Sequence, residues 1–125
     1  SALNGVVAQR LIRTLCPACK APAEPAVEAL ELADIASAVG SDWHFHRAVG
    51  CGVCRGTGYR GRRAIAELLV LNDEIRELII GRAPIRQLKE AARRGGTRSL
   101  RESAIDLVRA GVTSLEEANR VTFVA

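Results

Sequence analysis

Two pairs of cysteines constrain this chain more than any other feature of its sequence. Cys16 and Cys19 enclose Pro-Ala, and Cys51 and Cys54 enclose Gly-Val, so each pair has the spacing CxxC. Two intervening residues allow both sulfur atoms of a pair to face one ion, and two such pairs supply the four donors of a tetrahedral zinc site. The sequence therefore predicts one structural Zn²⁺ ion bound by Cys16, Cys19, Cys51 and Cys54.

The same cysteines have two alternative interpretations, as four reduced thiols without a ligand or as two redox pairs. A redox pair is typical of a thioredoxin-like strand–helix context, whereas each pair here lies in a turn rich in Gly or Pro. Four thiolates leave no coordination position for water, so a zinc ion bound by them would be structural. His44 and His46 lie upstream of the second pair, and we expect them not to be ligands because four sulfur donors already complete the site.

Length and composition indicate one small domain with an aliphatic core. The chain has 125 residues and only four aromatic ones, so a metal ion would help to stabilise a core of limited apolar area. No apolar run approaches the roughly 18–20 residues of a membrane span, and the first residues resemble the middle of a protein without a signal peptide. We therefore expect an excised fragment of a cytoplasmic protein, where CxxC pairs favour metal binding over disulfides.

The pattern of the chain predicts an α+β fold that is mostly helical. In the N-terminal half, residues 6–15 are ambiguous between strand and helix, with strand favoured by an incomplete alternation of apolar residues. Residues 25–39 predict a helix that begins near Pro25 and ends at Gly40. Residues 43–49 predict a short strand, and residues 63–70 predict a buried one.

Four further helices are predicted in the C-terminal half, and we expect them to form a compact cluster. The first of these helices begins at Asn72 and ends at Gly81, and the second begins at Pro84 and ends at Gly95. The third begins at a capping box of Ser99 with Glu102 and ends at Gly111, and the fourth begins at a second capping box of Thr113 with Glu116. Together with the cysteine pairs, these signals divide the chain into a small tetracysteine subdomain and a helical part.

Charge is distributed unevenly along the chain, whose formal net charge is +4. Residues 24–42 contain five acidic residues and no Lys or Arg, whereas residues 82–101 contain seven basic residues and one acidic residue. Such asymmetry is typical of an acidic partner surface, an anionic ligand or a solvated helix face. The basic segment is therefore a candidate contact surface.

The glycine-rich stretch after the second cysteine pair does not have the context of a nucleotide-binding loop. Gly56, Gly58 and Gly61 match the letters of GxGxxG, but they follow a CxxC turn and precede a predicted strand, and no Walker lysine is present. These glycines are better explained by the tight backbone of a metal-binding turn and a close approach to a neighbour. Tyr59 among neighbouring arginines leaves a zinc-dependent nucleic-acid-binding module as a second function class.

The order of several segments resembles the C-terminal region of bacterial type II secretion ATPases and of the related type IV pilus assembly ATPases. The segments are VVAQRLIRTLCPACK, FHRAVGCGVCRGTGYRGRRAIAELL and LVRAGVTSLEEANRVT. The resemblance implies that residues 1–15 are the tail of a RecA-like ATPase core, residues 16–62 a tetracysteine zinc-binding subdomain, and residues 63–125 a C-terminal strand with a helical subdomain. The four cysteines correspond to the metal ligands of that family.

The resemblance also implies a hexameric, ATP-driven motor at the cytoplasmic face of the inner membrane. ATP and Mg²⁺ would bind only to the core, whose nucleotide-binding boxes are not in this sequence. The expected partners are that core, neighbouring subunits and inner-membrane secretion platform proteins, with no specific nucleic acid and no transmembrane segment. Because the sequence also lacks a nucleophile–base pair, a carboxylate pair and HExxH, we expect an accessory, non-catalytic region.

Overall fold

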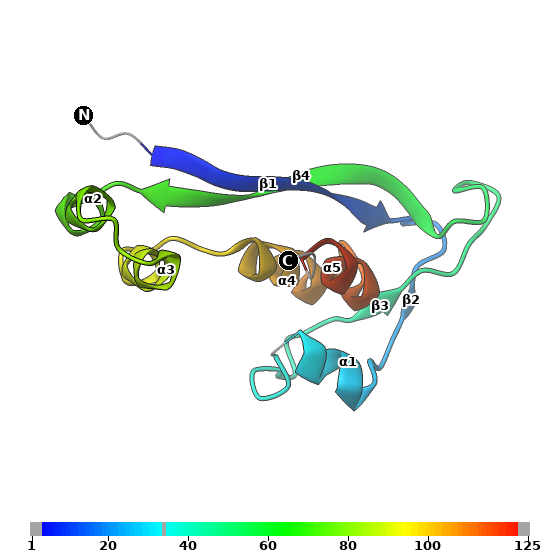
Figure 1. The fold of residues 1–125 in the computed structure, drawn as a ribbon. Coiled ribbons are helices and arrows are strands. Elements are labelled where there is room, and N and C mark those ends of the chain that lie inside the picture. The colour runs from blue at the N-terminus through cyan, green and yellow to red at the C-terminus, as the bar shows by residue number, and fades with distance from the viewer. Residues whose placement is uncertain (1–3, 34, 123–125) are drawn as a thin grey trace.

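A long antiparallel ribbon of two strands dominates the computed structural model, which describes residues 4–33 and 35–122. The ribbon consists of β1 (Asn4–Leu15) and β4 (Tyr59–Val70) (Figure 1). The strand interpretation of residues 6–15 is therefore confirmed. The predicted start of the second strand at residue 63 is wrong by four residues, because pairing of Leu15 with Tyr59 extends β4 back into the glycine-rich stretch.

The segment between the two ribbon strands forms a small separate layer. It contains β2 (Ala21–Pro22), α1 (Val27–Leu32) and β3 (His46–Arg47), and β2 pairs with β3 in an antiparallel sheet. The predicted helix over residues 25–39 is wrong in length, since α1 ends at Leu32 and buried Ile35 then packs into the core. The predicted strand over residues 43–49 is reduced to the two residues of β3.

All four helices predicted in the C-terminal half are confirmed. They are α2 (Asp73–Ile80), α3 (Ile85–Arg94), α4 (Leu100–Arg109) and α5 (Leu115–Thr122). The Asn72 side chain caps α2, and Ser99 with Glu102 forms the expected capping box of α4. No helix in the described ranges has the length and apolar character that a membrane span requires.

The predicted cap of the last helix is wrong by one residue. The Ser114 hydroxyl accepts a hydrogen bond from the Glu117 N–H (3.0 Å), as an N-cap does. Thr113 is fully buried and its hydroxyl instead donates to the Arg13 carbonyl of β1 (2.6 Å). The cap shifts because this buried hydroxyl bonds to the ribbon instead of the helix end.

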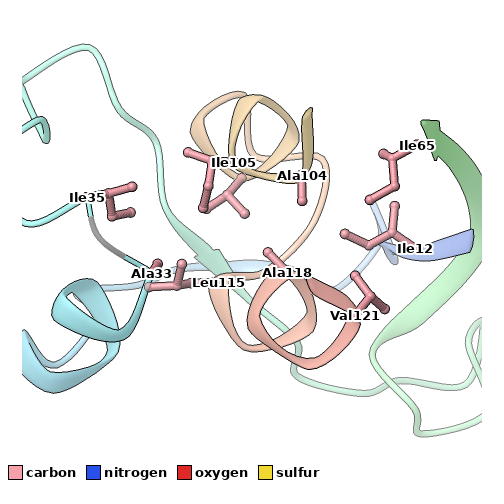
Figure 2. Close-up of a cluster of buried hydrophobic side chains, with 10 residues drawn as sticks. Ile12, Ala33, Ile35, Ile65, Ala104, Ile105, Leu115, Ala118 and Val121 are labelled. Carbon is pink, nitrogen blue, oxygen red and sulfur yellow. The ribbon is translucent and has the colours of Figure 1, made fainter. Parts of the chain in front are cut away.

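The four helices of the C-terminal half form two pairs on one side of the ribbon, with α4 and α5 packed against it and α2 and α3 near the end of β4, as Figure 1 shows. The larger core joins Ile12 and Ile65 of the ribbon to α4, α5 and the segment around α1 (Figure 2); its buried members are Ile12, Ala33, Ile35, Ile65, Ala104, Ile105, Val108, Leu115, Ala118 and Val121. A smaller core of Ile75, Ala91 and Ala92 joins α2 to α3. The ribbon thus connects two helical pairs, with the cysteine turns beyond its end at Leu15 and Tyr59.

Candidate metal centre

The antiparallel ribbon brings the two cysteine pairs together. Cys16 follows the last residue of β1, and Cys54 lies in the turn that leads into β4. Because the end of one antiparallel strand lies beside the start of its partner, the two turns meet at the same end of the ribbon. The Cys16 N–H donates to the Gly58 carbonyl (2.9 Å), which fixes one turn directly against the other.

The four sulfur atoms lie at the spacing of a tetrahedral metal site. The Sγ–Sγ distances are 3.9 Å for Cys16 and Cys51, 3.8 Å for Cys19 and Cys54, and 3.8 Å for Cys51 and Cys54. All four sulfur atoms lie within 4.8 Å of one another. A zinc ion with Zn–S bonds of about 2.3 Å separates its sulfur ligands by about 3.8 Å. The predicted cysteines are thus brought together and could hold a metal ion.

Backbone N–H groups of the second turn surround two of the sulfur atoms. The Gly58 and Cys51 N–H groups donate to Cys54 Sγ at 3.1 and 3.2 Å, and the Gly50 N–H donates to Cys19 Sγ at 3.3 Å. Hydrogen bonds to the ligand atoms orient a metal site and stabilise negative charge on its sulfur atoms. The glycine-rich turn therefore supplies donors as well as a tight backbone.

The pKa values of two thiols in the cluster shift in opposite directions. Burial raises the pKa of Cys54, but the N–H groups of Cys51 and Gly58 and the neighbouring thiols lower it to a net value of about 6. Burial and the thiols of Cys51, Cys54 and Cys16 raise the pKa of Cys19 to about 11, although the Gly50 N–H lowers it. The first negative charge is therefore favoured on Cys54. A bound cation would stabilise the thiolate form of all four cysteines and release their protons.

Two glycines of the turn are required by their backbone conformation and surroundings. Gly58 has φ +82°, and a Cβ atom there would lie 2.5 Å from the Ala48 Cβ. Gly50 has φ +107°, and a Cβ atom would lie 2.7 Å from the Gly56 carbonyl oxygen. The prediction of a tight turn with a close neighbour is confirmed. The stretch continues into β4 instead of the helix that a dinucleotide fingerprint needs.

The two histidines lie near the site in sequence but outside the sulfur cluster. His44 is exposed and His46 is half-buried in β3. The His46 Nδ1 atom lies 2.8 Å from the His44 carbonyl oxygen. Among the described residues, the group able to surround one ion consists of the four cysteines.

Sequence reasoning missed an ion-pair cluster around a buried carboxylate beside the site, which we call the Glu117 clasp and define as Glu117, Arg13 and Arg120. The Glu117 carboxylate accepts from the Arg13 backbone N–H (2.9 Å) and forms ion pairs with the Arg13 and Arg120 guanidinium groups (2.9 and 2.8 Å). Burial raises the pKa of Glu117, but the bonds from both arginines lower it to about 2. The clasp joins α5 to β1 three residues before Cys16. The only sequence signal for this cluster was an acidic residue in the first turn of α5.

Tyr59 contacts the same clasp and is not an open stacking surface. The Arg13 guanidinium lies 4.1 Å from the centre of the Tyr59 ring, and the Tyr59 hydroxyl lies 2.6 Å from the Ser114 hydroxyl oxygen. Base stacking in single-stranded nucleic acid complexes needs an accessible aromatic face. The one aromatic residue that favoured the nucleic-acid-binding alternative therefore has a structural role at the junction of the ribbon and α5.

A β-ribbon that ends in a four-cysteine site and carries helices along one face defines a candidate metal-binding region. The family profile described as "Type II/IV secretion system protein" matches residues 1–120, and the chain belongs to this family. It is 48% identical over 122 residues to "Type II secretion system ATPase E" of Vibrio cholerae and 42% identical over 117 residues to "Type IV pilus assembly ATPase PilB" of Thermus thermophilus. These matches cover 98% and 94% of this chain but only 24% and 13% of the two relatives.

Proposed function

We propose that this chain is the accessory C-terminal zinc-binding region of a type II secretion ATPase. The observation that carries the proposal is the set of four sulfur atoms at tetrahedral spacing in a chain that matches this ATPase family. In this proposal, residues 1–15 end the RecA-like core, residues 16–62 form the zinc-binding subdomain, and residues 63–125 form the C-terminal strand and helical subdomain. The region has a structural and protein-interaction role and does not hydrolyse ATP itself.

Zinc is the ion that best suits the donor set. Structural zinc sites commonly have four thiolates in a tetrahedral arrangement and no coordination position for water. Binding of such an ion contributes on the order of 10 kcal/mol to folding, which is comparable to the whole stability of a typical domain. Zinc bound by Cys16, Cys19, Cys51 and Cys54 would thus fix the segment between the ribbon strands to the end of the ribbon.

The larger protein in this proposal is a hexameric motor at the cytoplasmic face of the inner membrane. ATP and Mg²⁺ bind in its core, while this region braces the core and contacts neighbouring subunits and membrane platform proteins. The type II system is the first candidate, because the type II relatives are 40–48% identical and the pilus assembly relatives 37–43% identical to this chain. A pilus assembly ATPase is the second candidate, because one of the relatives named above, at 42% identity, is a type IV pilus assembly ATPase.

Metal content and stability test the proposal together. We expect one zinc per chain by elemental analysis, and Cys54→Ser should lose the ion and unfold residues 16–62 at least. Val53→Ala is the matched control, because this side chain is exposed in the same turn and offers no ligand. A native protein that contains no metal and is equally stable after chelation would contradict the zinc role. In the intact ATPase, Cys54→Ser should also abolish type II secretion while Val53→Ala supports it.

A further inference from the structure

An apolar groove lies between the two helical pairs, away from the cysteine cluster. It has a volume of about 270 Å³, and its apolar lining comes from β4, α2 and α3, namely Leu69, Ile79, Ile85, Leu88 and Ala92. Ile79 and Ile85 remain 48% and 68% exposed. Pockets that enclose small-molecule ligands have volumes of roughly 300–1,000 Å³, so this groove is better suited to a few side chains of a protein partner.

The α3 side of the groove carries positive charge. Lys89 and Arg93 of α3 line it and form no ion pair with any residue that the structure describes. The acidic residues of the lining are already engaged at the start of α4, where helix N–H groups favour negative charge. Glu67 accepts from the Leu100 N–H (3.1 Å), and Glu102 accepts from the Ser99 N–H (3.3 Å). A partner that packs along the α3 side of this groove should therefore combine apolar and acidic side chains.

Helix α1 of the same chain has that combination and none of its residues is buried. Val27 and Leu32 are 62% and 54% exposed, and Glu28 and Glu31 are exposed without an ion pair among the described residues. Residues three and four apart are neighbours on a helix surface. Val27 therefore lies beside Glu31, and Glu28 lies beside Leu32, so apolar and acidic groups form one exposed stripe.

We propose that α1 of one copy of this chain docks into the α2–α3 groove of a second copy. Glu28 and Glu31 pair with Lys89 and Arg93, while Val27 and Leu32 cover the apolar lining. Within one chain α1 contributes no residue to the groove, and it lies on the far side of α4 and α5 from the ribbon (Figure 1).

The contact is heterologous, because the two surfaces differ, and repetition of a heterologous contact closes a ring when the rotation permits. The inference deepens the proposed function, since it assigns surfaces through which neighbouring subunits of the hexamer meet. Each subunit of such a ring contributes α1 to one neighbour and its groove to the other.

A charge exchange in the intact ATPase tests the contact. The groove variant carries Lys89→Glu and Arg93→Glu, and the helix variant carries Glu28→Lys and Glu31→Lys. Self-association is measured by sedimentation velocity across a concentration series. We expect each variant to associate roughly tenfold or more weakly than wild type, because like charges then face each other. The chain with all four changes should regain most of the wild-type association, since the opposite charges again meet.

Controls separate this result from misfolding and from failure of the zinc proposal. Arg47→Glu with Arg60→Glu reverses the same number of exposed charges elsewhere and should leave association unchanged. Zinc content and thermal unfolding are measured for every variant and should match wild type, so weaker association cannot be attributed to unfolding. A chain without zinc would contradict the zinc proposal, whereas the charge exchange would still report on the contact.

Two results would overturn the docking proposal. In the first, the four-change chain associates no better than either two-change variant. In the second, the groove variant stops secretion while self-association stays at the wild-type level, which would assign the groove to a different protein.

Discussion

Replacement of Glu117 by Gln tests whether the Glu117 clasp holds the C-terminal helix to the ribbon. Gln has nearly the same shape but no charge, and its amide nitrogen would face guanidinium groups that need acceptors. The Glu117 side chain is fully buried, whereas the Arg13 and Arg120 side chains are about half exposed. The variant therefore leaves two partly hydrated cations without their shared acceptor.

The expected loss follows from the lowered pKa of the carboxyl group. A change from 4.5 in the unfolded chain to about 2 in the folded protein corresponds to about 3 kcal/mol of folding free energy. Because both arginines can recover water in the variant, we expect Glu117→Gln to lower the free energy of unfolding by about 2–3 kcal/mol at pH 7.

The stabilisation by Glu117 should depend on pH with a defined sign. A carboxyl whose pKa is lower in the folded state binds fewer protons there, so its contribution is complete well above pH 4.5 and falls as the pH drops toward 2. The difference between wild type and Glu117→Gln should therefore decrease between pH 5 and pH 2. Comparison of the two proteins at each pH removes the effect of cysteine protonation, which both share.

Urea unfolding followed by circular dichroism measures both proteins across this pH range. Glu116→Gln is the matched control, because Glu116 is exposed and adjacent in sequence, and we expect a change within about 0.5 kcal/mol. A Glu117→Gln loss below 1 kcal/mol at pH 7, or a loss that is equal at pH 7 and pH 3, would refute this explanation of the clasp.

Two further predictions concern the start of α5 and the metal-binding turn. Ser114→Ala should lower the free energy of unfolding by about 1 kcal/mol, because the helix cap is lost. In denaturant unfolding, adding Tyr59→Phe to Ser114→Ala should cause little further loss, because the Tyr59 hydroxyl no longer has its Ser114 partner. Fully additive losses from the two substitutions would contradict the shared hydrogen bond. Gly58→Ala should destabilise the fold by about 2 kcal/mol or more and weaken zinc binding in competition with a chelating dye. Gly56 has a similar positive φ but open space around it, so Gly56→Ala measures the backbone strain without a steric clash. Equal losses of stability for Gly56→Ala and Gly58→Ala would argue against the Ala48 contact.

Local patterns in the sequence were enough to predict the four-cysteine cluster and most helix boundaries. Two residues between cysteines determine how both sulfur atoms can face one point, whatever the rest of the fold does. Asn72 and Ser99 cap their helices through bonds to residues three positions away, so their effect is also readable from a short window. The ribbon interpretation of residues 6–15 was weaker, because its pairing partner lies more than 40 residues later in the chain.

Tertiary structure alone decided the features whose partners are distant in sequence. Glu117 and Arg13 are 104 positions apart, and nothing local distinguishes this buried carboxylate from exposed Glu116. The same long-range packing shifts the cap of α5 to Ser114, because Thr113 bonds to β1, and ends α1 early, because Ile35 packs into the core. Spacing and capping act within a few residues, whereas burial depends on which distant segments meet, and that depends on the whole fold.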